Sequence, residues 1–264
     1  MSSEELLYEV KDRVAVLTMN RPERLNALTP AMREGILHAV TTANQDNSVR
    51  ALILTGAGRG FCSGGDVKAM NEARTSGSFN TLDDRIAPVR DRVVLAMRNA
   101  DKPVIAAVNG PAAGAGMNIA LACDIRIMAR DATMGQTFSR RGLHPDWGGT
   151  YFLPRLIGIA KAAEMIWSGR MVSAEECFEL GIVSKLSDPE KLMDEVTAMA
   201  EGFADGPPVA IRLAKRAMYR NVDSSLEEAL EFETFAQNVC AATKDANEGI
   251  SAFVERRDPK FKGE

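Results

Sequence analysis

The chain has 264 residues, of which 45% are hydrophobic and 26% are charged, as is usual for a globular protein with a sizeable core. Its formal net charge of -4 argues against a general nucleic-acid-binding surface, which needs a basic excess, and leaves open a local basic pocket for a phosphorylated ligand. No apolar run approaches the roughly 18 residues of a membrane span, and the acidic start MSSEELLYEV lacks a signal-peptide pattern. We therefore expect a cytoplasmic protein with no membrane and no nucleic-acid partner.

Short β-branched runs, flanked by turn residues or glycine, recur in the first half of the chain and predict buried strands. They cover residues 14–19, 51–55, 104–108 and 125–129. A helix is predicted over residues 31–44, because Thr29 can cap it and Pro30 occupies its first position. Strands that alternate with helices indicate an α/β fold.

The second half changes character after Asp146, where residues 182–186 form the one clear strand-like run. Ser173 followed by Glu176 is typical of a capping box, and Gly181 is expected to end the helix that it starts. Amphipathic helices are predicted over residues 160–168, 174–180, 189–204, 207–220 and 226–243. We therefore predict an α/β core over residues 1–200 and a helical region over residues 201–264.

Two glycine-rich segments, residues 55–66 (TGAGRGFCSGGD) and 108–116 (VNGPAAGAG), each follow a predicted strand and open a helix. Small residues let a ligand approach the backbone, and free amides at a helix start favour negative charge. Two such amides on one carbonyl oxygen would form an oxyanion hole, which suits a thioester that becomes an enolate. The alternative is that the glycines serve only tight turns and close helix packing.

Other readings of these segments are weaker. Gly114 and Gly116 begin a dinucleotide-binding pattern, but Ile119 stands where the third glycine is needed. No G-x-S-x-G sequence is present, so Ser63 is better explained as a small residue lining a ligand groove than as a nucleophile. The four cysteines form no C-x-x-C pair, which favours free thiols and predicts no metal site; they are Cys62, Cys123, Cys177 and Cys240.

Five ordered segments together resemble the enoyl-CoA hydratase/isomerase (crotonase) family. They are FCSGGD (61–66), AAVNGPAAGAGMNIALACD (106–124), MGQTFSRRGLHPDWGGTYFLPRLIG (134–158), SAEECFELGIVSKL (173–186) and AFVERRDPKFK (252–262). The resemblance implies a crotonase-type spiral of ββα units followed by a C-terminal helical region that forms trimers, usually paired into hexamers. It also implies an acyl-CoA thioester substrate and no cofactor, since coenzyme A is part of the substrate.

The resemblance also assigns binding positions. The two oxyanion amides of the family match Gly65 and Ala115. Arg24 and Lys68 offer cations for phosphates, although each alone could be a solvated surface charge. In the family coenzyme A lies along positions that match Arg24, Leu25, Ala27, Ser63, Gly64, Asp66, Val67 and Lys68.

Family hydratases use two glutamates, and this chain has Asn118 and Phe138 at the matching positions. Neither residue can transfer a proton, which puts two-carboxylate hydration in doubt. Asp146 matches the proton-transferring aspartate of dienoyl-CoA isomerases and of the ring-epoxide isomerases of phenylacetate breakdown, which this chain resembles most in motif. Phe138 and Trp147 would partly desolvate the carboxylate and raise its proton affinity.

Several alternatives stay open from the sequence. Asp146 could simply cap the following helix, and His144 could support or replace it as an acid/base. The leading hypothesis is an isomerase that shifts a double bond through the oxyanion hole and Asp146. A hydratase acting on a 2-enoyl-CoA and a non-catalytic acyl-CoA-binding homologue are the alternatives. Residues 71–92 are expected to shape the acyl pocket.

Overall fold

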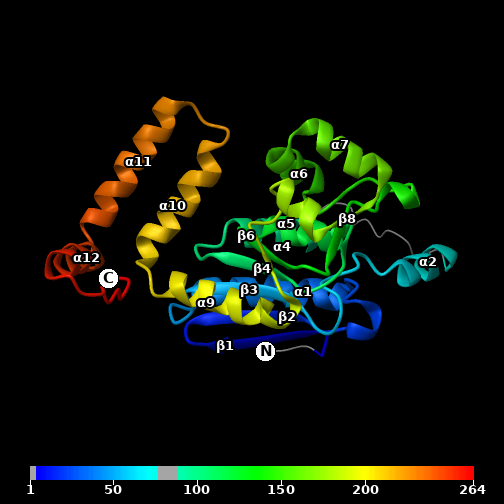
Figure 1. Ribbon diagram of the computed structural model, residues 1–264, viewed down its shortest axis with the longest axis horizontal. Helices are drawn as coiled ribbons and strands as arrows, with labels where there is room; N and C mark the ends of the chain where they lie inside the picture. The colour runs from blue at the N-terminus through cyan, green and yellow to red at the C-terminus, as the bar shows by residue number, and fades with distance from the viewer. Residues whose placement is uncertain (1–3, 77–88) are drawn as a thin grey trace.

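The structure is a computed structural model that describes residues 4–76 and 89–264. At its centre is a sheet in the order β1-β2-β3-β4-β6-β9, in which β1 pairs antiparallel with β2 and the other neighbours pair in parallel (Figure 1). The strands are β1 (Leu6–Lys11), β2 (Val14–Met19), β3 (Ala51–Gly56), β4 (Val104–Val108), β6 (Ile125–Ala129) and β9 (Lys185–Ser187). A smaller sheet, in the order β5-β7-β8, contains β5 (Ala112–Ala113), β7 (Thr133–Gly135) and β8 (Met171–Ser173). The mixed α/β architecture predicted from the sequence is confirmed.

Helices cover the central strands. Every residue of β3 and β4 is buried, as expected for parallel strands enclosed on both faces. The helix α9 (Leu192–Ala204) packs across β2, β3, β4 and β6. The helix α1 (Pro30–Gln45) packs on β1, β2 and α4 (Val89–Arg98).

The predicted start of α1 is confirmed in detail. The Thr29 hydroxyl oxygen accepts a hydrogen bond from the Met32 amide at 3.1 Å, and Pro30 follows at the first helical position. The buried positions recur at helical spacing, so one stripe of the helix faces the core. They are Met32, Ile36, Ala39, Val40 and Ala43.

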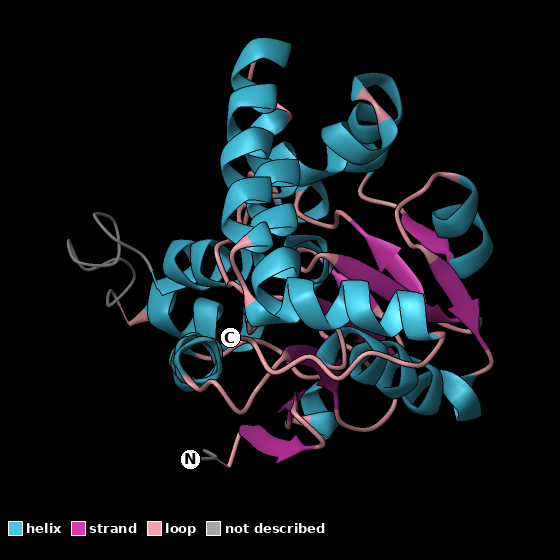
Figure 2. Cartoon of the chain, turned by 90° about the vertical axis from the view of Figure 1, so that its left-hand side faces the viewer, coloured by secondary structure: helices cyan, strands magenta, loops and turns pink. Residues whose placement is uncertain are grey.

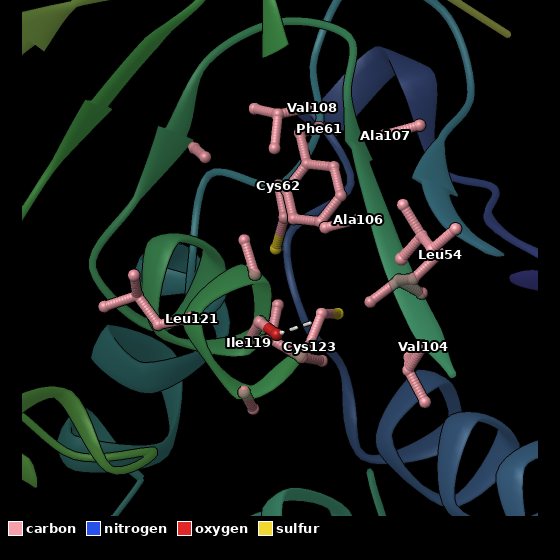
Figure 3. Packing of buried hydrophobic residues seen from close by; sticks show 14 of the residues in the cluster. Leu54, Phe61, Cys62, Val104, Ala106, Ala107, Val108, Ile119, Leu121 and Cys123 are labelled. Atoms are coloured by element: carbon pink, nitrogen blue, oxygen red, sulfur yellow. Dashed lines mark hydrogen bonds between the residues drawn. The ribbon is translucent and has the colours of Figure 1, made fainter. Parts of the chain in front are cut away.

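The helix α5 (Ala115–Ala122) is buried at every residue, which marks it as a central core helix. Figure 3 shows Ile119 and Leu121 of α5 in a cluster with Phe61, Cys62 and Val108. The helix α6 (Gly149–Ile157) packs against α5, and α7 (Ile159–Ser168) packs on α6. The helix α8 (Ala174–Glu179) packs on β8 and β9, and α2 (Val67–Thr75) lies at the edge of the molecule (Figure 1). The second glycine-rich segment therefore opens into a helix that is buried along its whole length.

The C-terminal helices extend away from the sheet (Figures 1 and 2). They are α10 (Pro208–Asn221), α11 (Leu226–Ala241) and α12 (Lys244–Glu255), and α10 packs along α11. The predicted division at residue 200 falls inside α9, and the chain leaves the sheet only at α10. A separate trimerisation region over residues 201–264 stays a prediction.

The strand predicted over residues 182–186 is wrong in position. Ile182 and Val183 are buried, but both amides bond back to the Cys177 carbonyl oxygen, at 2.8 and 3.3 Å. Gly181, with φ +76, turns the chain at the end of α8 and permits these bonds. Ile182 and Val183 therefore belong to the turn that ends α8, and strand pairing starts only at Lys185.

Two further boundaries differ from the predicted helices. Residues 189–191 form a short 3-10 turn, η3 (Pro189–Lys191), before α9 begins. The helix predicted to end at Thr243 ends at Ala241, because Thr243 caps α12 by accepting from the Ala246 amide at 3.0 Å. No helix in the described part of the chain combines the length and apolarity needed to cross a membrane.

Candidate active site

The two glycine-rich segments lie side by side in the structure. The Cys62 amide donates to the Pro111 carbonyl oxygen at 3.1 Å, and the Ala113 amide donates to the Cys62 carbonyl oxygen at 2.9 Å. A Cβ atom on Gly116 would overlap that same Cys62 oxygen, so only glycine lets α5 approach this closely. The loop that follows β3 is thereby fixed against the start of α5.

Two backbone amides are left free at this junction. Within residues 4–76 and 89–264, neither the Gly65 amide nor the Ala115 amide donates a hydrogen bond. Ala115 is the first residue of α5, where no carbonyl lies one turn earlier in the helix. A Cβ atom on Gly64 would lie 3.4 Å from the Ala115 nitrogen, which places the Gly64–Gly65 backbone next to that amide. The pair can donate to one shared oxygen atom.

Phe138 forms an apolar wall beside these amides. It precedes η2 (Ser139–Arg141), and its side chain is buried. Two of its ring atoms lie 3.5 Å from the position of a Cβ on Gly114, the residue that caps α5. The ring contributes no proton-transfer group, so it can only exclude water and contact an apolar part of a ligand.

Asp146 lies in the turn between η2 and α6. Its side chain is 37% exposed overall, yet Oδ1 is sealed from solvent and has no hydrogen-bond partner among the described residues. The other oxygen, Oδ2, lies 3.9 Å from Nε of Arg90 on α4. The capping interpretation of Asp146 is wrong, because the N-cap of α6 is Gly148 and no side chain caps that helix.

The surroundings of Asp146 change its acidity. Burial raises the pKa of the Asp146 carboxyl above its ordinary value, and the guanidinium groups of Arg90 and Arg33 oppose this with smaller effects. The carboxylate therefore has a higher proton affinity than a solvated aspartate, which suits a group that must both take and return a proton.

Asn118 is completely buried and uses both ends of its amide. Its Nδ2 donates to the Asp146 carbonyl oxygen at 2.7 Å, and its Oδ1 accepts from Gln136 Nε2 at 2.6 Å. Gln136 is completely buried as well. At this position, where family hydratases have a glutamate, the side chain therefore supports the Asp146 turn.

The two segments expected to hold coenzyme A also lie together. The Ser63 amide donates to the Leu25 carbonyl oxygen at 2.8 Å, and the Ser63 hydroxyl donates to the Arg24 carbonyl oxygen at 3.2 Å. Ala27 is buried beside them, whereas the side chains of Arg24 and Lys68 are exposed. Two exposed cations thus flank the paired segments, although coenzyme A binding there stays a prediction.

The Asp66 side chain is occupied within the protein. Its Oδ1 accepts from the Ala69 amide at 3.1 Å, and its Oδ2 accepts from Arg21 at 3.2 Å. These contacts, the Ala69 hydrogen bond first, lower the pKa of Asp66. Asp66 therefore holds the start of α2, and the adjacent Val67, which is 49% exposed, offers the apolar surface.

His144 and Trp147 lie in different environments, one exposed and the other buried. Trp147 is buried, with a left-handed backbone at φ +54. His144 is exposed and lines a surface pocket of about 370 Å³ with residues of α6 and α7, including Ile159 and Trp167. A proton-transfer role for His144 stays a prediction, and no hydrogen bond joins it to Asp146 among the described residues.

Sequence reasoning missed two residues of the site. Arg90 belongs to the segment 71–92 that was expected to shape the acyl pocket, of which residues 77–88 lie outside the described residues. No local pattern singles Arg90 out. Gln136 lies in a segment that carries the family resemblance. A glutamine within an otherwise apolar run could have pointed to a buried polar network, but no site role was predicted for it. In the described part of the chain, no group of three or more His, Cys, Asp or Glu side chains could hold a metal ion.

Comparison with known proteins gives one consistent family. A family model described as enoyl-CoA hydratase/isomerase matches residues 9–264. The chain is 37% identical over 264 residues to the crotonyl-CoA hydratase of Syntrophomonas wolfei, covering 99% of both proteins. It is 38% identical over 260 residues to the 1,2-epoxyphenylacetyl-CoA isomerase of Escherichia coli, covering 98% of this chain and 99% of that relative.

Solved structures agree. The enoyl-CoA hydratase of Bacillus anthracis has a TM-score of 0.92 at 36% identity, covering 98% of this chain and all of that one. A putative enoyl-CoA hydratase/isomerase of Mycobacterium abscessus has a TM-score of 0.93 at 32% identity, with 98% and 100% of the two chains covered. The resemblance of the five ordered segments is thereby confirmed, and the chain belongs to the enoyl-CoA hydratase/isomerase family of crotonase-fold enzymes.

Proposed function

We propose that the protein shifts a double bond within the acyl group of an enoyl-CoA thioester. One observation carries the proposal. The two positions that match the hydratase glutamates hold Asn118, whose amide is engaged at both ends, and Phe138, a buried ring. Asp146 instead keeps a buried oxygen with no partner among the described residues. One carboxylate without a second favours proton transfer over the activation of water.

The chemistry follows from this arrangement. The Gly65 and Ala115 amides would donate to the thioester oxygen and stabilise the negative charge that develops there. The Asp146 carboxylate takes a proton from the carbon next to the carbonyl of a 3-enoyl-CoA, and the electron pair of that C–H bond enters a dienolate. The protonated Asp146 then delivers the proton to C4, and the double bond moves from C3–C4 to C2–C3.

The binding of coenzyme A would use the paired segments. Two exposed cations, Arg24 and Lys68, flank them and can attract phosphate groups. Ser63 and Gly64 present small residues where the pantetheine arm would pass. The remaining residues of the proposed groove are Leu25, Ala27, Asp66 and Val67, and the thioester would require no separate cofactor.

The second candidate function is hydration of a 2-enoyl-CoA, because several relatives are named as hydratases. The relative from Syntrophomonas wolfei and the solved structure from Bacillus anthracis are both named as hydratases. In that case Asp146 alone would place the water molecule. A non-catalytic acyl-CoA-binding role is disfavoured, because a buried carboxylate oxygen without a partner is costly to keep unless it is used.

One experiment separates the two reactions. The purified protein is given 3-hexenoyl-CoA and, separately, 2-hexenoyl-CoA, and each conversion is followed by the absorbance of the conjugated thioester. We expect isomerisation to exceed hydration by about 10²-fold or more, the usual contribution of one positioned acid/base group. Hydration faster than isomerisation would establish the hydratase instead.

A further inference from the structure

We propose that Asn118 is a positioning residue for Asp146. Its side chain holds the main chain of the turn that carries the Asp146 carboxylate. The inference rests on the proposed function, because it concerns the group that this function assigns as the base. Asn118 Nδ2 donates to the Asp146 carbonyl oxygen at 2.7 Å across 28 residues of chain. The Gly149 amide donates to the same oxygen at 3.1 Å, so both of its lone pairs are occupied.

The orientation of the Asn118 amide is fixed by chemistry. The Asp146 carbonyl oxygen can only accept, so the NH₂ end of Asn118 must face it. The Asn118 oxygen then faces Gln136, which must present its own NH₂ end, at 2.6 Å. A reversed amide would set two acceptors against each other at Asp146. The buried pair can therefore hold one arrangement only.

The turn that carries Asp146 needs such a restraint. Trp147 and Gly148 follow it with φ values of +54 and +77, two successive left-handed residues. For a tryptophan this backbone is unfavourable, because its Cβ crowds the main chain, so the surrounding structure must hold it. The first residue of α6, Gly149, packs on the Asn118 amide so closely that a Cβ atom there would overlap Nδ2. The turn is thereby anchored to α5 at both its carbonyl and its helix start.

Because Asn118 lies on α5, the same helix holds both the Asp146 turn and the free Ala115 amide. Ala115 and Asn118 lie three residues, about one turn, apart on the same side of one helix. One end of α5 thus supplies a free amide for the thioester oxygen, and the next turn fixes the group that would move the proton. Their spacing is set by one rigid buried helix. A displacement of about 1 Å in such a group can cost roughly 10²-fold in rate.

The test uses isomerisation of 3-hexenoyl-CoA by Asn118→Leu, a change of similar volume that removes the donor. We expect kcat to fall on the order of 10²-fold, with KM changed less than about twofold, since the binding groove is untouched. The acidic limb of the kcat/KM profile should move to lower pH, because a carboxylate released from its turn is better solvated and has a lower pKa. If the variant only lost folded protein, the rate would fall equally at every pH, and the acidic limb of the kcat/KM profile would not move.

Asn118→Asp is the second variant, in case Asn118→Leu does not fold. It keeps the size and can accept from Gln136, but it offers the Asp146 turn no donor and adds a negative charge. The acidic limb should then move to higher pH, opposite to Asn118→Leu. Ser187→Ala, which removes a buried hydroxyl on β9, is the control and should leave kcat and the limb unchanged.

The outcomes separate the two claims. Asp146→Asn is measured in parallel, and if it keeps near-normal turnover, the proposed function and this inference both fail. If Asp146→Asn is inactive while both Asn118 variants keep the kcat and pH limb of the unmodified protein, the inference alone is wrong. A fall in kcat with an unmoved pH limb would likewise overturn it, since Asn118 would then be purely structural.

Discussion

Lys215 of α10 lies with its Nζ 2.7 Å from Oδ2 of Asp124, in an ion pair whose side chains are only 5% and 14% exposed. The lysine also donates to the Lys102 carbonyl oxygen at 3.0 Å, and Tyr219 donates to the other Asp124 oxygen. The Val104 amide completes the set of donors around this carboxylate, at 2.8 Å. This cluster is the buried polar connection between the C-terminal helices and the sheet.

We expect Lys215→Met to lower the free energy of unfolding by about 3 kcal/mol, because it leaves a buried carboxylate without its cation. Urea unfolding at one fixed protein concentration measures this loss. Burial lowers the pKa of Lys215, so the pair already carries a desolvation cost. Removing both charges with Lys215→Met and Asp124→Asn should therefore recover part of the stability. A double variant less stable than the single one would contradict this account.

Asp146→Asn should abolish turnover while leaving thioester binding nearly intact. The amide keeps the size of the side chain but cannot accept the proton, and a positioned acid/base group contributes about 10²–10⁴-fold in rate. Steady-state turnover and equilibrium binding of butyryl-CoA, measured on one preparation, give both quantities. Near-normal turnover would defeat the assignment and make His144 the next candidate.

The pH profile should respond to Arg90. Burial raises the pKa of Asp146 and the Arg90 guanidinium opposes it, so removing that positive charge with Arg90→Gln should raise the pKa further. The base acts only when ionised, and activity falls as the pH falls through its pKa. The acidic limb of kcat/KM should therefore shift to higher pH. Arg92→Gln, an exposed arginine two residues along α4, is the matched control, and an equal shift there would exclude a local effect.

The protein should assemble as a trimer or as paired trimers. Large apolar side chains on α10, α11 and α12 are exposed in the single chain, and such a surface marks a contact between proteins. Met218, Leu226, Leu230, Phe235, Phe253 and Val254 are each at least half exposed. Light scattering should report three or six times the 28.6 kDa of one chain. A stable monomer at micromolar concentration would refute this prediction.

Local signals account for what the sequence predicted of the fold. Strands β2, β4 and β6 fall on their predicted residues, because each is a buried β-branched run with turn residues on both sides. The edge strand β1 was missed because most of its residues are at least partly exposed and charged residues interrupt it, so no apolar run marks it. The sequence does not predict α12, because Thr243 fits the end of the preceding helical pattern and its role as the cap of the next helix shows only in the structure.

The candidate site likewise contains residues that the sequence could identify and contacts that it could not. Asp146, Asn118 and Phe138 could be singled out because they stand at positions of an ordered family resemblance. The hydrogen bond from Asn118 to the Asp146 main chain could not, since it depends on the left-handed backbone at Trp147 and on the approach of two helices. Arg90 reaches Asp146 from a helix that is distant in sequence, and no local pattern encodes that contact.

The contact of Gly116 with the Cys62 carbonyl oxygen has a consequence for folding. The Gly65 and Ala115 amides become neighbours only when two segments 50 residues apart in sequence have docked, and neither α5 nor the preceding loop can build the site alone. Non-local contacts of this kind form slowly, because their loop-closure entropy must be overcome first. During refolding, helical signal should therefore return before the ability to bind a thioester. Binding would thus report the arrival of the native topology, which helix content alone does not.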